Sequence, residues 1–108
     1  MRKIETLMIN AIRNRRDWNS GNTSVDVTDH GAIVRLHGNK IAQVDYDNNV
    51  TWITDAGWQT TTTKSRLNAL LMGINQRGHV YQKNHIWHLI RGDETVEMDR
   101  NESYCVSM

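Results

Sequence analysis

The sequence has no proline and no phenylalanine, and its single cysteine is Cys105. One cysteine cannot form an intramolecular disulfide, which is typical of proteins that work in a reducing compartment. Without proline, the turns must be made by glycine, asparagine and aspartate, which tolerate tight-turn backbone conformations. Without phenylalanine, the aromatic part of the core has to come from 4 Trp and 3 Tyr.

Long hydrophobic runs are also missing. No stretch approaches the roughly 18 apolar residues of a membrane-spanning helix, so we expect no membrane contact. The N-terminal segment is interrupted by Glu5, Thr6 and Asn10, unlike a secretory signal peptide. We therefore expect a cytoplasmic protein. The 108 residues suit one domain, which we place at 1–108 with a frayed tail over about 100–108.

Motifs for catalysis, cofactors and metals are absent as well. The sequence has no phosphate-binding glycine loop, no nucleophile elbow and no zinc-type Cys/His spacing. His85 and His88 are three residues apart in a predicted strand, so their side chains would point to opposite faces. Cys105 lies in the predicted tail with no histidine positioned beside it. We therefore expect no catalytic residue, no metal and no cofactor, and interpret the chain as a non-enzymatic binding protein.

Apolar periodicity predicts two helices and two groups of strands. One stripe at helical spacing predicts a helix over residues 3–16, and a second predicts a helix that begins near Thr63, capped by Thr62 or Thr63. Alternating patterns predict strands at 23–28, 32–37, 40–46, 50–54, 79–83, 85–90 and 94–99. The expected fold is α+β, in which an antiparallel sheet, made of a four-stranded meander and a three-stranded C-terminal segment, packs against two helices.

The four tryptophans fall into two pairs. Trp52 and Trp87 lie in the middle of predicted strands, and we expect both in the core. Trp18 and Trp58 flank the predicted helices, and we expect them to close the edge of the core. An aromatic ring beside cations can also stack a nucleic-acid base, which leaves a second interpretation open.

Charge is segregated along the chain although the formal net charge is only +1. Residues 61–91 contain five cations and no acid, whereas residues 92–108 contain five acids and Arg100 as the one cation. Such segregation predicts one basic and one acidic face, unless folding mixes the two again. The five cations are Lys64, Arg66, Arg77, Lys83 and Arg91.

The stretch GWQTTTTKSRLNALL (57–71) places Lys64 and Arg66 in the predicted first turn of the second helix. The helix dipole disfavours cations there by about 0.3–1 kcal/mol each. Three explanations are open: solvated charges whose cost is tolerated, a carboxylate from the protein's own tail, or an external anion or acidic partner. The third predicts a partner- or anion-binding surface of Trp58, Thr61, Thr62, Lys64, Ser65 and Arg66. A nucleic-acid alternative adds Arg13, Arg15 and Arg16.

Three segments carry a family resemblance: TSVDVTDHGAIVRLHGNKIAQVD, TWITDAGWQTTTTKSRLNALL and VYQKNHIWHLI. Over residues 20–99 the chain resembles a family of small uncharacterised accessory proteins of tailed phages and their prophages. The resemblance brings no catalytic residues with it. It implies a protein of the bacterial host cytoplasm that binds and inhibits a host nucleic-acid-handling or defence complex, such as a nuclease or a CRISPR complex. Direct nucleic-acid binding is the alternative, and a homodimer would cover exposed edge strands.

Overall fold

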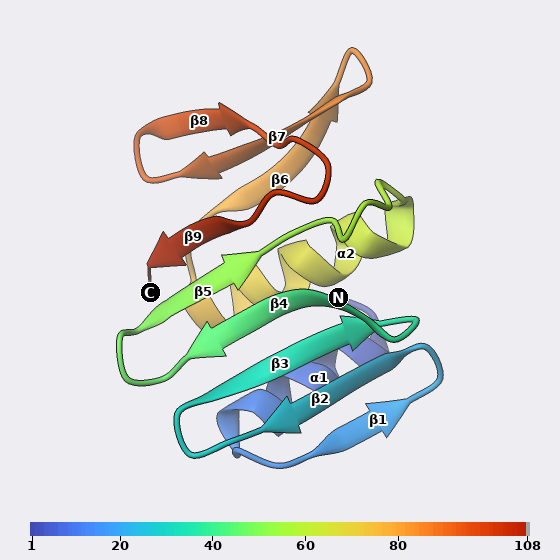
Figure 1. Cartoon of the computed structure of the whole chain (residues 1–108), viewed down its shortest axis with the longest axis vertical. Helices are drawn as coiled ribbons and strands as arrows, with labels where there is room; N and C mark the ends of the chain where they lie inside the picture. Colours follow the sequence, from blue (N-terminus) through green and yellow to red (C-terminus); the bar gives the residue numbers. More distant parts are fainter. Residues whose placement is uncertain (108) are drawn as a thin grey trace.

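A computed structural model describes residues 1–107 (Figure 1). The chain is α+β, as predicted, with two antiparallel sheets. The helices are α1 (Lys3–Arg13) and α2 (Thr61–Leu70), and α2 continues into a π-helical turn, η1 (Leu71–Asn75). The strands are β1 (Trp18–Ser20), β2 (Thr23–Val27), β3 (Gly31–Leu36), β4 (Asn39–Asp45), β5 (Val50–Ile53), β6 (His79–Lys83), β7 (Ile86–Arg91), β8 (Glu94–Glu97) and β9 (Tyr104–Ser107).

The six-stranded sheet has the order β1-β2-β3-β4-β5-β9, and both helices lie on one of its faces (Figure 1). Val25, Val34, Ala42 and Ile53 are aligned across the four central strands and are buried. This row is the apolar half of the alternation that the sequence shows. It forms the core between the sheet and the helices and leaves the other face of the sheet uncovered.

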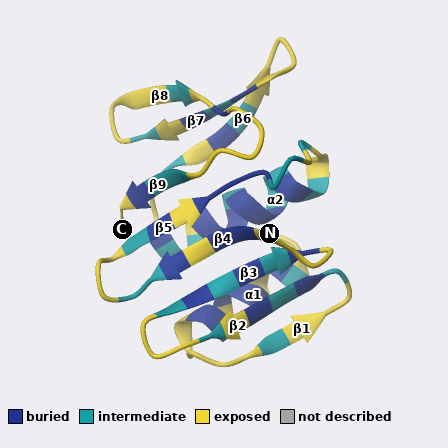
Figure 2. Cartoon of the chain, in the orientation of Figure 1, coloured by how far each residue is buried: buried dark blue, intermediate teal, exposed yellow. Residues whose placement is uncertain are grey.

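The second sheet has the order β6-β7-β8 and lies at one end of the molecule. Val80, Trp87 and Leu89 project from it into the core and are buried, so the predicted core position of Trp87 is confirmed. The same prediction for Trp52 is wrong, because the register aligns it with Gln43 and Cys105 on the uncovered face of the large sheet. Trp52 is 45% exposed, and β5 accordingly shows an exposed segment in Figure 2.

Part of the predicted frayed tail, which was placed at about 100–108, is a strand in the structure. Residues 104–107 form β9, which pairs with β5 and buries Val106 in the core. Strand pairing with a segment about fifty residues earlier in the chain leaves no local pattern in the sequence. Met108 belonged to the same prediction and lies outside the described residues.

The two helices run side by side and parallel. Glu5, in the first turn of α1, contacts Arg66 in the middle of α2, and at the C-terminal end of α1 the Arg13 guanidinium donates to the Gly73 carbonyl of η1. Gly73 permits this close approach, since a Cβ at that position would lie 2.6 Å from Cδ1 of Ile9. The first helix ends at Arg13 rather than at residue 16, because Arg15 adopts a positive φ of 54°. No helix within residues 1–107 is long and apolar enough to cross a bilayer.

Candidate functional site

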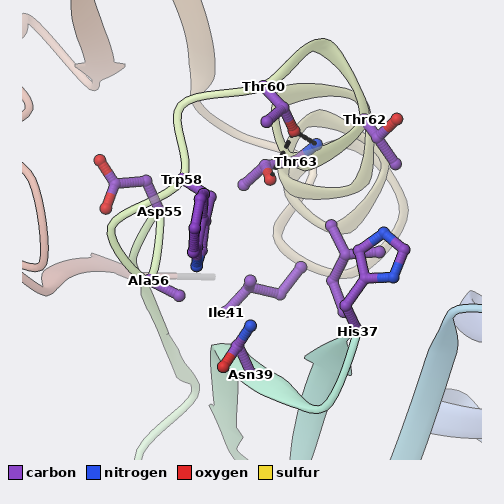
Figure 3. A pocket seen from close by; sticks show the side chains of 10 residues that line it. His37, Asn39, Ile41, Asp55, Ala56, Trp58, Thr60, Thr62 and Thr63 are labelled. Atoms are coloured by element: carbon purple, nitrogen blue, oxygen red, sulfur yellow. Dashed lines mark hydrogen bonds between the residues drawn. The ribbon is translucent and has the colours of Figure 1, made fainter.

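A hollow of about 420 Å³ lies between the β3–β4 turn, the loop after β5 and the first turn of α2 (Figure 3). Trp58 stands on one side of it and His37 on the other, with Ile41 between them. Trp58 is 63% exposed, so its indole presents a large apolar surface to solvent. We call this feature the Trp58 hollow; it is lined by Leu36, His37, Asn39, Ile41, Asp55, Ala56, Trp58, Thr60, Thr62 and Thr63.

Asp55 holds the loop that presents Trp58. Its carboxylate is 1% exposed, and Oδ1 accepts hydrogen bonds from the backbone N–H groups of Gly57 at 2.7 Å and Asn101 at 2.9 Å. Its Oδ2 accepts from the Gln59 side chain at 3.0 Å. Gly57 is required in this turn, because its φ is +88° and a Cβ there would approach the Asn101 side chain. The loop is therefore anchored from three directions, and Trp58 extends from a fixed backbone.

The second helix begins earlier than the sequence pattern predicts. Its N-cap is Thr60, whose hydroxyl accepts a hydrogen bond from the Thr63 backbone N–H at 3.1 Å. Lys64 is thus the fourth helical residue and Arg66 the sixth. The first turn contains only threonines, so the predicted conflict between two cations and the helix dipole does not arise there.

Arg66 is a buried structural residue and not part of a binding surface, which corrects the prediction. It is 3% exposed, and its Nη1 donates to Oε2 of Glu5 at 2.8 Å. Its other nitrogens donate to Thr23 at 3.0 Å and Asn22 at 3.2 Å. Of the three explanations, pairing with an internal carboxylate is correct for Arg66. The carboxylate is supplied by Glu5 of α1 and not by the acidic tail.

Ser65 belongs to the same buried network, because its hydroxyl donates to Oε2 of Glu5 at 2.7 Å. The other oxygen of Glu5 accepts the backbone N–H of Arg2 at 3.2 Å. Burial raises the pKa of Glu5, but the hydrogen bonds from Ser65, Arg2 and Arg66 and the charge of Arg66 outweigh it. The net effect lowers the pKa below its ordinary value of 4.5.

Acid should remove the contribution of Glu5 to stability. A lowered folded-state pKa means that this contribution is complete above pH 4.5 and is lost as the pH falls toward the folded-state value. Urea unfolding of the wild type and Glu5→Gln should therefore give a large difference at neutral pH that narrows near pH ~3. Glu102→Gln, at an exposed carboxyl, is the control and should match the wild type at both pH values. A Glu5→Gln difference that is independent of pH would contradict the assignment.

The remaining predicted surface residues surround the Trp58 hollow or lie near it. Thr62 lines it, Thr61 is exposed beside it, and Lys64 is half-buried one turn further along α2. Lys64 makes no ion pair within residues 1–107. Together with Trp58, these residues stay a predicted binding surface, from which Ser65 and Arg66 are removed.

The three arginines of the nucleic-acid alternative lie at the other end of the helix pair. The Arg13 guanidinium donates to the carbonyl of Gly73. Gly73 follows Lys64 by nine positions, which separates the two residues by roughly 13 Å along a helix. The Arg15 guanidinium stacks 4.2 Å above the Tyr46 ring, and Arg16 is exposed beyond it. Burial raises the pKa of Tyr46, with Arg15 opposing that shift. The structure therefore does not join these arginines to Lys64 in one surface.

Sequence reasoning missed most of the hollow, because only Trp58 and Thr62 of its lining residues belong to the predicted binding surface. Leu36, His37, Asn39 and Ile41 come from the β3–β4 hairpin, which the pattern predicted as two strands without a binding role. The one available signal was the family resemblance. Two of its segments, RLHGNKIAQ (35–43) and GWQTTTTKSRLNAL (57–70), are the parts of the chain that meet at the hollow. Their contact depends on how the hairpin packs against α2, which neither segment reveals alone.

The family model described as Kyanoviridae Gp96 protein matches residues 1–107. No curated protein and no solved structure matches the chain. The match extends over both sheets and both helices, including the Trp58 hollow. The chain therefore belongs to the Kyanoviridae Gp96 family of phage proteins.

Proposed function

We propose that this phage protein acts by binding a host protein through the Trp58 hollow, without catalysing a reaction. The observation that carries this proposal is the position of Trp58, which is 63% exposed on the wall of a hollow with the apolar residues Leu36, Ile41 and Ala56 in its lining. Tryptophan is enriched among the residues that dominate binding energy at protein interfaces. A ring of this size can bury about 150–250 Å² against a partner.

The rigidity of the loop supports the same proposal. The hydrogen bonds of Asp55 hold the backbone N–H of Gly57 before Trp58 and the side chain of Gln59 after it, so little conformational freedom is lost when a partner binds. Preorganisation of this kind raises affinity because the entropic cost of ordering is met during folding. A mobile tryptophan with the same exposed area would bind more weakly.

The charges around the hollow favour an acidic partner group. Within residues 1–107 the only acid that lines the hollow is Asp55, and both of its oxygens already accept hydrogen bonds. Lys64 and the N-terminal end of α2 lie nearby and attract negative charge. We therefore propose a partner segment that inserts an apolar side chain beside a carboxylate.

Trp58→Ala should abolish stable partner capture, because it removes the aromatic wall of the hollow. Tagged wild type is expected to retain a host protein at moderate salt, and binding of the purified partner should weaken about 30-fold in the variant, equivalent to ~2 kcal/mol. Calorimetry measures this difference. Trp52→Ala is the matched control, since it removes an exposed tryptophan from another face. Equal loss in both variants, or none in Trp58→Ala, would exclude the hollow as the docking site.

We propose further that docking inhibits a host nucleic-acid-handling or defence complex, such as a nuclease or a CRISPR complex. Membership of a phage protein family supports this context, because such a protein meets host machinery during infection. The test adds wild type or Trp58→Ala to the captured complex and measures its cleavage activity. Inhibition by the wild type alone is expected. A complex that is bound but keeps full activity would refute inhibition while leaving docking intact.

A further inference from the structure

The six-stranded sheet has one face that neither helix covers. In Figure 1 both helices lie behind the strands, so this uncovered face points toward the reader. The strand registers align one row of outward-pointing residues across its middle, which is Asp26, Ile33, Gln43, Trp52 and Cys105. Asp26, at the β2 end of this central row, forms an ion pair with Arg35. The β2 end of the row is therefore neutral.

Trp52 is the large apolar residue of the uncovered face. It is 45% exposed, and Ile33 and Val50 on the same face are half-buried. A shallow hollow of about 290 Å³ beside the indole is lined by Lys40, Gln43, Asp45, Trp52 and Ser103. Because tryptophan is enriched among the residues that dominate binding energy, an exposed one on an open sheet favours an interface there.

A β-bulge decides which charges this face carries. The pairing of β3 with β4 shifts between Val34 and Arg35, which leaves Ile41 as an extra residue of β4. Without the bulge, the alternation of side chains would place Lys40 and Gln43 on opposite faces. With it, Lys40 shares the uncovered face, and its Nζ donates to Oε1 of Gln43 at 3.4 Å.

Lys40 and Asp45 are consequently placed symmetrically about Gln43. Each lies one step of the side-chain alternation away from it, roughly 7 Å along the strand, in opposite directions. Neither forms an ion pair in the described part of the chain. Hydrogen bonds from Asn48, chiefly from its side chain, lower the pKa of Asp45, so this carboxylate is ionised at neutral pH. The face thus presents one unpaired charge of each sign on either side of its centre.

We propose that the uncovered face binds a second copy of this chain in a two-fold symmetric dimer. The axis runs between the two sheets, parallel to the central row, and reverses the direction of β4 in the second copy. Lys40 of each protomer then faces the partner's Asp45, and the two Trp52 rings meet at the centre. Such an interface is isologous, because the same patch serves both copies. A partner segment of one charge sign would attract one of the two residues and repel the other.

The size of the face sets the strength of this dimer. Six strands about 4.8 Å apart span roughly 25 Å, which suits an interface at the small end of the stable range. We therefore expect a dissociation constant of tens of micromolar, so the chain is mostly monomeric at low micromolar concentration. The sequence predicted a homodimer that covers edge strands, whereas this interface covers a face. It shares no residue with the lining of the Trp58 hollow and does not depend on the function proposed for that site.

Sedimentation velocity of the full chain over a concentration series tests the proposal. The wild type should be monomeric at about 1 μM and mostly dimeric at about 500 μM. Lys40→Glu should weaken association at least about 10-fold, because it places acids opposite acids, and Asp45→Lys should do the same with cations. The double variant with both substitutions should recover association, since opposite charges again face each other. Circular dichroism verifies that each variant is folded. Lys3→Glu, at an exposed cation of α1, is the matched control and should associate like the wild type.

Two further measurements locate the interface. Trp52→Ala should weaken association at least about 10-fold, whereas Trp58→Ala removes an exposed tryptophan elsewhere and should stay within about 2-fold of the wild type. Cys105 lies beside Trp52 in the central row, so a short bismaleimide should join the cysteines of two copies in the wild type. The proposal is overturned if the wild type stays monomeric at about 500 μM, if Lys40→Glu associates as well as the wild type, or if the folded double variant stays as weak as the single ones. Dimers that the bismaleimide cannot join also overturn it.

Discussion

Replacement of Arg66 by methionine should lower the free energy of unfolding by about 3–5 kcal/mol, because it leaves the Glu5 carboxylate buried without its charged partner. Glu5 is 2% exposed and cannot be rehydrated without opening the contact between the helices. The substitution also removes donors from Thr23 and Asn22. A loss of this size is a large part of the roughly 5–15 kcal/mol that stabilises an ordinary domain. Urea denaturation followed by tryptophan fluorescence measures it.

Lys64→Met is the matched control for this experiment. It makes the same exchange two residues earlier, at a cation that forms no ion pair within residues 1–107. Its effect should stay within about 0.5 kcal/mol. Equal effects of the two substitutions would show that Arg66 is a surface residue. The double variant Glu5→Leu with Arg66→Met should recover part of the loss, since apolar groups can replace a buried ion pair without a large penalty.

Trp87→Ala should destabilise the protein by about 3–5 kcal/mol, because it empties the largest fully buried side-chain position. Trp87 joins the β6–β7 hairpin to the core, and its carbonyl accepts the Met98 backbone N–H at 2.8 Å. The cavity would therefore weaken the attachment of the whole three-stranded sheet. Thermal unfolding monitored by circular dichroism measures the effect, seen as a lower melting temperature.

Trp52→Ala is the control for Trp87→Ala. Both tryptophans lie in the middle of strands, yet Trp52 is 45% exposed and Trp87 is 2% exposed. The control should cost about 1 kcal/mol or less, because much of the removed surface already contacts water. A loss for Trp52→Ala that equals the loss for Trp87→Ala would mean that both faces of the large sheet are buried.

Local periodicity was enough to predict most of the secondary structure. The stripe through Met8 and Ile12 and the alternation through Val25 and Val34 repeat over short distances, and burial follows directly from such repeats. A turn at Gly38-Asn39 was also expected from turn chemistry, but the structure places it one residue earlier: His37 and Gly38 have positive φ and Asn39 begins β4. Element ends were less accurate, as Thr60 shows, because four consecutive threonines all have the side chain of an N-cap and only the packed loop selects one.

The sequence by itself therefore determined the fold class, the order of the main elements and the segregation of charge. The tertiary structure alone decided which charges remain available, since the ion pair between Glu5 and Arg66 joins residues 61 positions apart. It also decided that Trp52 faces solvent and Trp87 does not, and that the β3–β4 hairpin meets α2 at the Trp58 hollow. The physical reason is that periodicity identifies the two faces of an element, whereas exposure depends on what packs against each face.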